Sequence, residues 1–248
     1  LVHLRLASLD DTTRCDHLRQ AVEVLRTATK NKTSPAVAVE LAITLSEYSR
    51  ALAALTTKSN RDEITNVQDE ALSVFSQIDL NAAAPQILPR IQLACGLLHH
   101  DVAQRSGLDA ATAVEHSRQA VELLEKASQK PLRNLPASSL TAQFTAAKII
   151  HGVNLTRRQS FTEARGVLLE TERASASDQI EPTLKLAAQI SLVVTELGLN
   201  NVEQAQSRLN KAENLLTSIS ELGKIDSDWL NQQREQLAKI RNQIRAKS

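Results

Sequence analysis

The stretch His17-Leu-Arg-Gln-Ala-Val-Glu-Val-Leu25 returns almost unchanged as His116-Ser-Arg-Gln-Ala-Val-Glu-Leu-Leu124. A near-copy within one chain indicates an internal repeat, and a repeat governs the whole architecture. The two stretches share an alanine followed three and four residues later by an apolar pair. This spacing places the three side chains on one face of a helix, so each stretch predicts an amphipathic helix.

The alanine-led pattern also occurs in three weaker copies. The five sets are Ala21-Val24-Leu25, Ala71-Val74-Phe75, Ala120-Leu123-Leu124, Ala164-Val167-Leu168, and Ala205 with Leu209. In three copies another alanine follows seven residues after the first, on the same face: Ala28, Ala127 and Ala212. The pattern predicts helices over residues 12–30, 61–79, 109–129, 161–175 and 201–218.

A proline precedes each long apolar stretch between these helices, at Pro35, Pro85, Pro136 and Pro182. Proline is tolerated in the first turn of a helix, where its missing N–H costs nothing, and it disrupts helix interiors. The stretches are apolar on more than one side, which is typical of a helix sandwiched between neighbours. We therefore expect intervening helices over residues 35–56, 85–104, 137–157 and 182–198.

A last helix is predicted over residues 227–246. Its narrow apolar stripe consists of Leu230, Leu237, Ile240 and Ile244, and Asp226 can cap its start. A helix with one solvent-exposed face is typical of the end of a repeat array. We expect an all-α fold over residues 1–248 as a single domain, a right-handed α-solenoid of about five antiparallel helix pairs that ends in a capping helix over 226–248. Because the chain opens at Leu1 and contains no Met, we also expect it to be a piece of a longer protein.

Gly152-Val-Asn-Leu155 followed by Phe161-Thr-Glu-Ala164 resembles a tetratricopeptide repeat (TPR). In that resemblance Ala164 takes the place of the second-helix alanine. Gly152 and Leu155 fall at the small and aromatic positions of the first helix, Phe161 at the aromatic position just before the second helix, and Leu168 at the large apolar position of the second helix. The match at motif level covers about residues 147–217. The key alanines are 41–50 residues apart, against about 34 in the family, and the Trp and Tyr of the first helix are missing. The resemblance implies a degenerate, TPR-like helical repeat domain that binds proteins or peptides.

Composition excludes several classes of protein. Aromatic residues make up only 2% of the chain and the formal net charge is +1, so a nucleic-acid surface of clustered basic and stacking side chains is not expected. Cys15 and Cys95 give no disulfide or metal spacing and are expected to be buried. No apolar run reaches the length of a membrane span. We expect a cytoplasmic protein, with an extracytoplasmic domain of a larger protein as the alternative.

No motif for catalysis, phosphate binding or metal binding occurs, so we expect a protein that is not an enzyme and carries no cofactor or metal. His99-His100-Asp101 is the most conspicuous polar cluster. Adjacent histidines on a helix point about 100° apart and cannot both face one metal ion. We interpret the cluster as a partly exposed helix surface.

The leading functional hypothesis is a scaffold or adaptor module whose intervening helices line a concave groove. The groove residues expected to contact a protein or peptide ligand are Arg90, Lys148, His151, Asn154 and Gln189. Arg90, Lys148 and His151 would make this groove mildly basic, which favours an acidic ligand. Two alternatives remain: a homodimer that pairs through the C-terminal helix and an exposed Trp229, and a regulatory or sensor segment of a parent enzyme such as a kinase.

Overall fold

The protein was examined as a computed structural model, which describes residues 10–30, 35–55, 61–80, 83–130, 132, 136–174, 180–223 and 225–247. Every regular element within these ranges is an α-helix, and they contain no strand. The prediction of an all-α protein is confirmed. The sequence Leu1–Leu9 also reads as the end of a helix, but these residues lie outside the described ranges.

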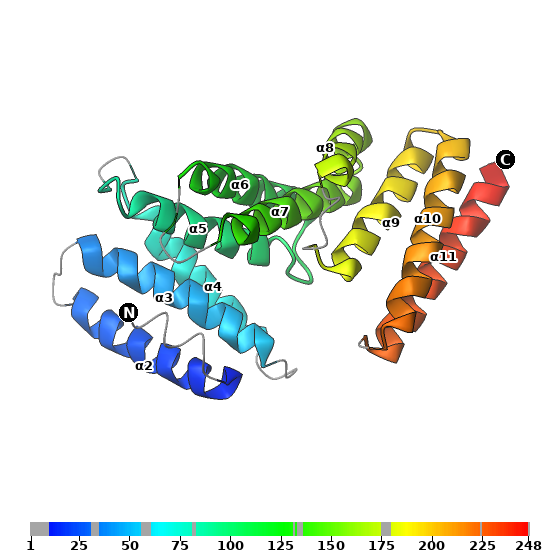
Figure 1. The fold of residues 1–248 in the computed structure, drawn as a ribbon. Coiled ribbons are helices and arrows are strands. Elements are labelled where there is room, and N and C mark those ends of the chain that lie inside the picture. The colour runs from blue at the N-terminus through cyan, green and yellow to red at the C-terminus, as the bar shows by residue number, and fades with distance from the viewer. Residues whose placement is uncertain are drawn as a thin grey trace. The chain divides into compact units, whose positions relative to one another are not determined.

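The helices are numbered as in Figure 1: α2 (Asp11–Lys30), α3 (Pro35–Ala54), α4 (Arg61–Ser76), α5 (Leu88–Val102), α6 (Ala110–Ser128), α7 (Ala137–Arg157), α8 (Phe161–Ala174), α9 (Pro182–Gly198), α10 (Val202–Glu221) and α11 (Ser227–Lys247). Each corresponds to one of the helices predicted from the repeat. Pro35 and Pro182 open α3 and α9 as expected, whereas α5 begins three residues after Pro85, at Leu88.

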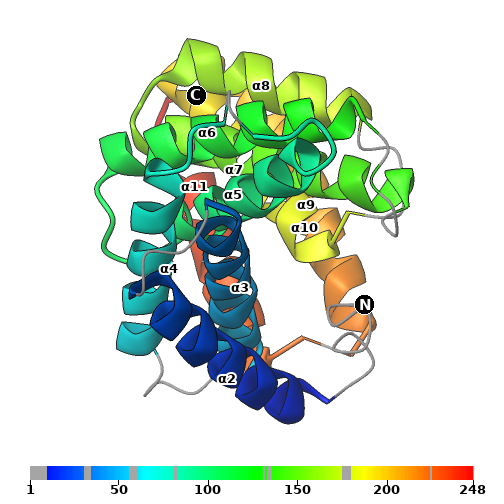
Figure 2. The ribbon, with the colours of Figure 1, turned by 90° about the vertical axis from the view of Figure 1, so that its left-hand side faces the viewer.

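The contacts divide the chain into two compact units. Unit 1 comprises Leu1–Val102 and Glu122–Leu132, and unit 2 comprises Ala103–Val121 and Arg133–Ser248, so the division falls within α6. In unit 1, α3 lies alongside α2 and also packs against α4 and α5 (Figure 1, Figure 2). In unit 2, α7 packs against α8 and α9, and α9 packs against α8, α10 and α11.

The intervening helices are buried on several sides, as predicted. In α9, for example, Leu186, Ile190, Val193 and Leu197 join the core of unit 2, while Thr195 and Glu196 are buried on other sides. The alanine-led helices bury one face, with Ala71, Ala120, Ala164 and Ala205 fully inaccessible. The sequence pattern therefore identified the buried face of α4, α6, α8 and α10, although these helices also bury residues outside the pattern, such as Val67, Ser117 and Ile219.

Helix α2 departs from the prediction. The expected core face contained Ala21, Val24 and Leu25, but Val24 is 68% exposed. The residues that α2 buries are Cys15, Leu18 and Val22. These lie on a neighbouring face of the same helix, which joins the core of unit 1 together with α3.

Two glycines allow close helix crossings. A methyl group added to Gly152 of α7 would lie 2.5 Å from Leu168 Cγ of α8. One added to Gly96 of α5 would lie 2.9 Å from Leu124 Cγ. Real side chains essentially never approach so closely, so each leucine occupies space that only a glycine leaves open. Leu124 and Leu168 occupy the same position of the predicted repeat.

Helix α11 buries the stripe that its sequence predicts, and the carboxylate of Asp226 accepts hydrogen bonds from the N–H groups of Asp228 (2.7 Å) and Trp229 (3.1 Å). Trp229 is partly buried against the core of unit 2, so the expectation of an exposed indole is wrong. Near the other end of the helix, Lys247 Nζ donates to the carbonyl of Leu197 at the end of α9 (3.1 Å). None of the helices in the described ranges is long and apolar enough to cross a membrane.

Candidate functional site

The five predicted groove residues divide between the two units. Arg90 lies on α5 of unit 1, whereas Lys148, His151 and Asn154 lie on α7, and Gln189 lies on α9, all in unit 2. They do not share one environment. Two are charged and ion-paired, two are buried, and one lines a cleft.

Arg90 and Lys148 each form an ion pair with a carboxylate of the same chain. Arg90 donates to both carboxylate oxygens of Glu40 on α3, at 2.6 and 3.0 Å, in a bidentate ion pair. Lys148 donates to Glu170 on α8 at 2.7 Å, and its ammonium lies 4.7 Å from the ring centroid of Phe144. Each pair joins neighbouring helices and reduces the basic character expected of a groove at these positions.

The side chains of His151 and Asn154 are buried, at 8% and 2% exposure. Asn154 donates to the carbonyls of Ala103 (3.2 Å) and Ala113 (3.3 Å), and His151 Nδ1 lies 3.0 Å from the hydroxyl of Ser117. Burial lowers the pKa of His151. These two residues tie α7 to the segment around the start of α6, and they leave little surface for a ligand.

Gln189 lines a cleft of about 200 Å³ in unit 2, which we call the α8–α9 cleft. Its floor is aliphatic, because Leu168 and Leu192 line it with at most 1% exposure. The complete lining is Ile149, Leu168, Thr171, Glu172, Lys185, Ala188, Gln189, Leu192 and Leu215. A ligand of ordinary small-molecule size needs about 300 Å³ or more, so this cleft fits a single side chain better than a cofactor.

A polar network borders the α8–α9 cleft. Glu172 accepts hydrogen bonds from Gln189 (3.0 Å) and from Arg208, and Lys211 lies 3.8 Å from the same carboxylate. Burial by itself raises the pKa of Glu172, but the hydrogen bonds from Arg208 and Gln189 and the charge of Lys211 outweigh it and leave the pKa below its usual value. Glu172 is therefore ionised at neutral pH.

One atom of this network is unsatisfied. The Oε1 atom of Gln189 is buried and has no hydrogen-bond donor among the described residues. A buried polar atom without a partner costs about 1–3 kcal/mol, so a donor placed in the cleft would be favoured. This unmet acceptor makes Gln189 the residue of the α8–α9 cleft that a ligand with a hydrogen-bond donor would address.

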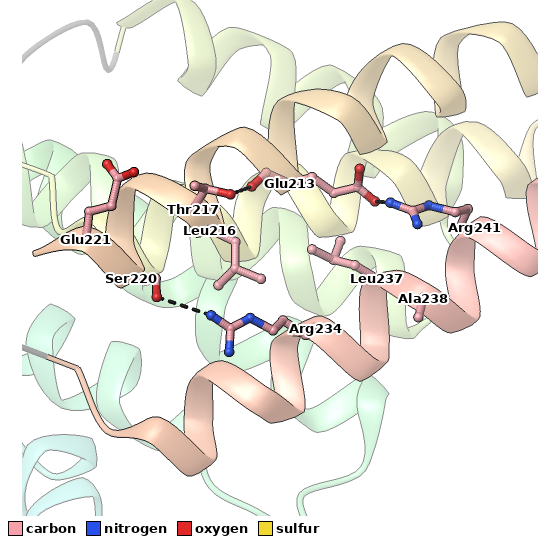
Figure 3. Close-up of a pocket in the computed structure, with 9 residues that line it drawn as sticks. All are labelled: Glu213, Leu216, Thr217, Ser220, Glu221, Arg234, Leu237, Ala238 and Arg241. Carbon is pink, nitrogen blue, oxygen red and sulfur yellow. Dashed lines mark hydrogen bonds and ion pairs between the residues drawn. The ribbon is translucent and has the colours of Figure 1, made fainter. Parts of the chain in front are cut away.

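A larger groove of about 510 Å³ lies between α10 and α11 (Figure 3). Its polar side chains bond to one another: Arg241 pairs with Glu213, and Arg234 donates to the hydroxyl of Ser220 at 3.2 Å. Its floor consists of Leu216 and Leu237, which already belong to the core of unit 2. The groove is wide, but its two arginines already have hydrogen-bond partners within the chain, so it is the weaker candidate.

The His99-His100-Asp101 cluster is partly exposed, at His100 and Asp101. His99 is only 9% exposed, and Asp101 lies 3.3 Å from Arg50 of α3. Burial lowers the pKa of His100 to about 4 and raises the pKa of Asp101 to about 6. No group of three or more metal-ligating side chains was found within the described ranges. The prediction of a partly exposed helix surface is confirmed for His100 and Asp101 and is wrong for His99, which is buried.

Comparison of the chain with protein-family models, with curated proteins and with solved structures gives no match.

Proposed function

We propose that the chain is a non-catalytic protein- or peptide-binding module, built of TPR-like helix pairs that stack as a right-handed solenoid. The observation that carries this proposal is the packing of α7 against both α8 and α9, and of α9 against both α10 and α11. Contact of one helix with the next helix and with the next but one is typical of stacked helix pairs. The glycine–leucine crossings support the same arrangement.

The α8–α9 cleft is the proposed contact point for the ligand. Its aliphatic floor suits a Leu, Ile or Val side chain, and the Oε1 atom of Gln189 suits a backbone N–H of an extended peptide. Lys185, Arg208 and Lys211 outnumber the single carboxylate of Glu172 around the cleft. We therefore propose a peptide in which acidic residues flank an aliphatic one.

The test is a selection of random 12-residue peptides displayed on phage against the full chain, followed by calorimetry of the best binder. We expect enrichment of an aliphatic residue next to Asp or Glu. Ala188→Leu fills the α8–α9 cleft and should weaken binding at least about tenfold. Ala238→Leu places the same bulk in the α10–α11 groove and should leave the affinity unchanged. If Ala238→Leu weakened binding and Ala188→Leu did not, the site would lie in the α10–α11 groove instead. A selection without enrichment would refute peptide binding.

Homodimerisation through the C-terminal helix is less well supported than ligand binding. The stripe that would pair with a second copy is buried against the core of unit 2, with Leu237 and Ile244 at 3% and 2% exposure. Pairing through this stripe would require α11 to leave its place. A regulatory role within a parent enzyme remains compatible with the proposed binding module.

A further inference from the structure

Three donor groups converge on one carboxylate oxygen at the edge of the α8–α9 cleft. The Oε1 atom of Glu172 accepts hydrogen bonds from Nη1 of Arg208 and from Nε2 of Gln189 (3.0 Å). The ammonium of Lys211 lies 3.8 Å from the same oxygen. The four side chains come from α8, α9 and α10, so the cluster lies wholly within unit 2. Two cationic side chains therefore share a single carboxylate.

The guanidinium of Arg208 carries more donors than this contact uses. An arginine has five N–H donors in a planar fork that fits both oxygens of a carboxylate. Among the residues that the structure describes, Arg208 bonds only to Oε1 of Glu172. Arg26 and Arg90 of unit 1, by contrast, each bond to both oxygens of one glutamate. Arg208 therefore retains N–H groups that a further carboxylate can engage.

Of the two members of this ion pair, only Glu172 faces the cleft. Glu172 is part of the cleft lining and its side chain is 31% exposed, whereas Arg208 is not part of the lining and is 14% exposed. A partly exposed glutamate side chain can turn into solvent at small cost, because water solvates its charge. Such a turn would open Arg208 to a ligand in the cleft.

We propose that Arg208 binds the carboxylate of an acidic side chain of the ligand, and that Glu172 competes with this carboxylate for Arg208. The inference rests on the proposed binding of peptides in the α8–α9 cleft and adds how that binding is regulated. In the free chain Glu172 holds the guanidinium. In the complex the ligand carboxylate takes this place, and Glu172 turns toward solvent. One ion pair replaces another, and the two carboxylates repel each other, so Glu172 lowers the affinity for acidic ligands.

Two synthetic peptides that differ in charge test the exchange. The first is acetyl-Ser-Asp-Leu-Asp-Ser-amide, and the second has Asn in place of both Asp residues. They offer the same leucine and the same backbone N–H groups to the cleft. Their Kd values are measured by NMR titration of the full chain. Glu172→Gln should lower the Kd of the Asp peptide about 3–10-fold, because the competing charge is gone, and should leave the Kd of the Asn peptide within about twofold.

Matched variants locate the effect. Glu170→Gln is the control, because Glu170 lies on the same helix, pairs with Lys148 and does not line the cleft, so the affinity for both peptides should stay unchanged. Arg208→Gln added to Glu172→Gln should make the two peptides bind equally. Lys211→Gln, at a side chain that is 57% exposed, should keep the circular dichroism spectrum of the parent and weaken the Asp peptide alone, by about threefold.

The outcomes separate this inference from the proposed function. An ion pair that only holds α8 against α10 predicts that Glu172→Gln weakens both peptides to the same extent, and this result would overturn the inference. An affinity for the Asp peptide that Glu172→Gln leaves unchanged would also overturn it, while the cleft would remain a peptide site. Binding of neither peptide, to the parent chain or to Glu172→Gln, would refute peptide binding in the cleft and the inference with it.

Discussion

The crossing of Gly96 with Leu124 in unit 1 and the crossing of Gly152 with Leu168 in unit 2 are built from the same parts. In both, the glycine lies on an intervening helix and the leucine lies four residues after the key alanine of the repeat. They differ in closeness, because an added methyl group would lie 2.9 Å from the first leucine and 2.5 Å from the second. The repeat therefore determines which glycine and leucine meet, while the distance between them differs from one unit to the other.

The polar groups near the two crossings differ more. Beside Gly152, Asn154 and His151 bond to carbonyl and hydroxyl groups of unit 2. Four and five residues after Gly96, the partly buried titratable groups of His100 and Asp101 lie near Arg50. Helices that share one repeat pattern therefore differ in the few polar residues that pack beside the crossing.

The largest effect should come from closing these crossings. Gly152→Val should destabilise unit 2 by about 3 kcal/mol, and Gly96→Val should destabilise unit 1 by about 2 kcal/mol, because the clash is closer at Gly152. Gly166→Ala is the control: nothing lies within 4 Å of the added methyl group, and it should stabilise α8 by about 0.5–1 kcal/mol. Hydrogen exchange resolved by peptide separates the two units. A larger loss at Gly96 would contradict the comparison.

Acidification should change the stability of unit 1 in opposite directions through two titratable groups, His100 and Asp101. The pKa of His100 falls from 6.5 to about 4 on folding, so between pH 7 and 5 protonation of the unfolded chain lowers stability. The pKa of Asp101 rises from 3.8 to about 6, so over the same range protonation of the folded chain raises stability. The nearby charge of Arg50 lowers both values, and the two effects of acidification oppose each other.

Urea unfolding at pH 7 and pH 5 checks this balance. His100→Gln should make the protein gain stability on acidification, and Asp101→Asn should make it lose stability, each by about 1–2 kcal/mol relative to the parent chain. His151→Gln in unit 2 should resemble His100→Gln, since burial lowers the pKa of that histidine as well. Identical pH profiles for the three variants and the parent would refute the assigned pKa shifts.

The smallest effect concerns two matching helix starts. Asp10 accepts a hydrogen bond from the N–H of Thr13 (3.0 Å) and Asp109 accepts one from the N–H of Thr112 (3.0 Å), and both threonine hydroxyls return to the same carboxylate. Asp10→Ala and Asp109→Ala should each lower the Tm by about 1–3 °C, by removing an N-cap. Differential scanning calorimetry measures both Tm values, with Asn242→Ala on the exposed surface as the control. A loss of Tm in only one of the two aspartate variants would show that the two caps are not equivalent.

The positions of the helices could be predicted from the sequence because alanine spacing and prolines are local signals. The partners of polar residues could not. Arg90 meets Glu40 fifty residues away, and Asn154 meets Ala103 fifty-one residues away. A polar residue within an apolar helix suits either a surface or a buried bond, so His151 and Asn154 were assigned to a groove. The exposure of Val24 depends on which helices surround α2, which its own sequence does not encode.

The hydrogen bond from Lys247 to the carbonyl of Leu197 joins the final turn of α11 to a residue fifty positions earlier in the chain. That carbonyl, at the end of α9, also accepts a hydrogen bond from the N–H of Asn200 (3.2 Å), so Lys247 is its second donor. Lys247→Ala would remove the ammonium that joins the last turn of α11 to this carbonyl and to the side chain of Asn200, so the ends of α9 and α11 would be held together less firmly. A change near the end of α11 would thus act directly on a helix end that lies fifty residues earlier in the sequence.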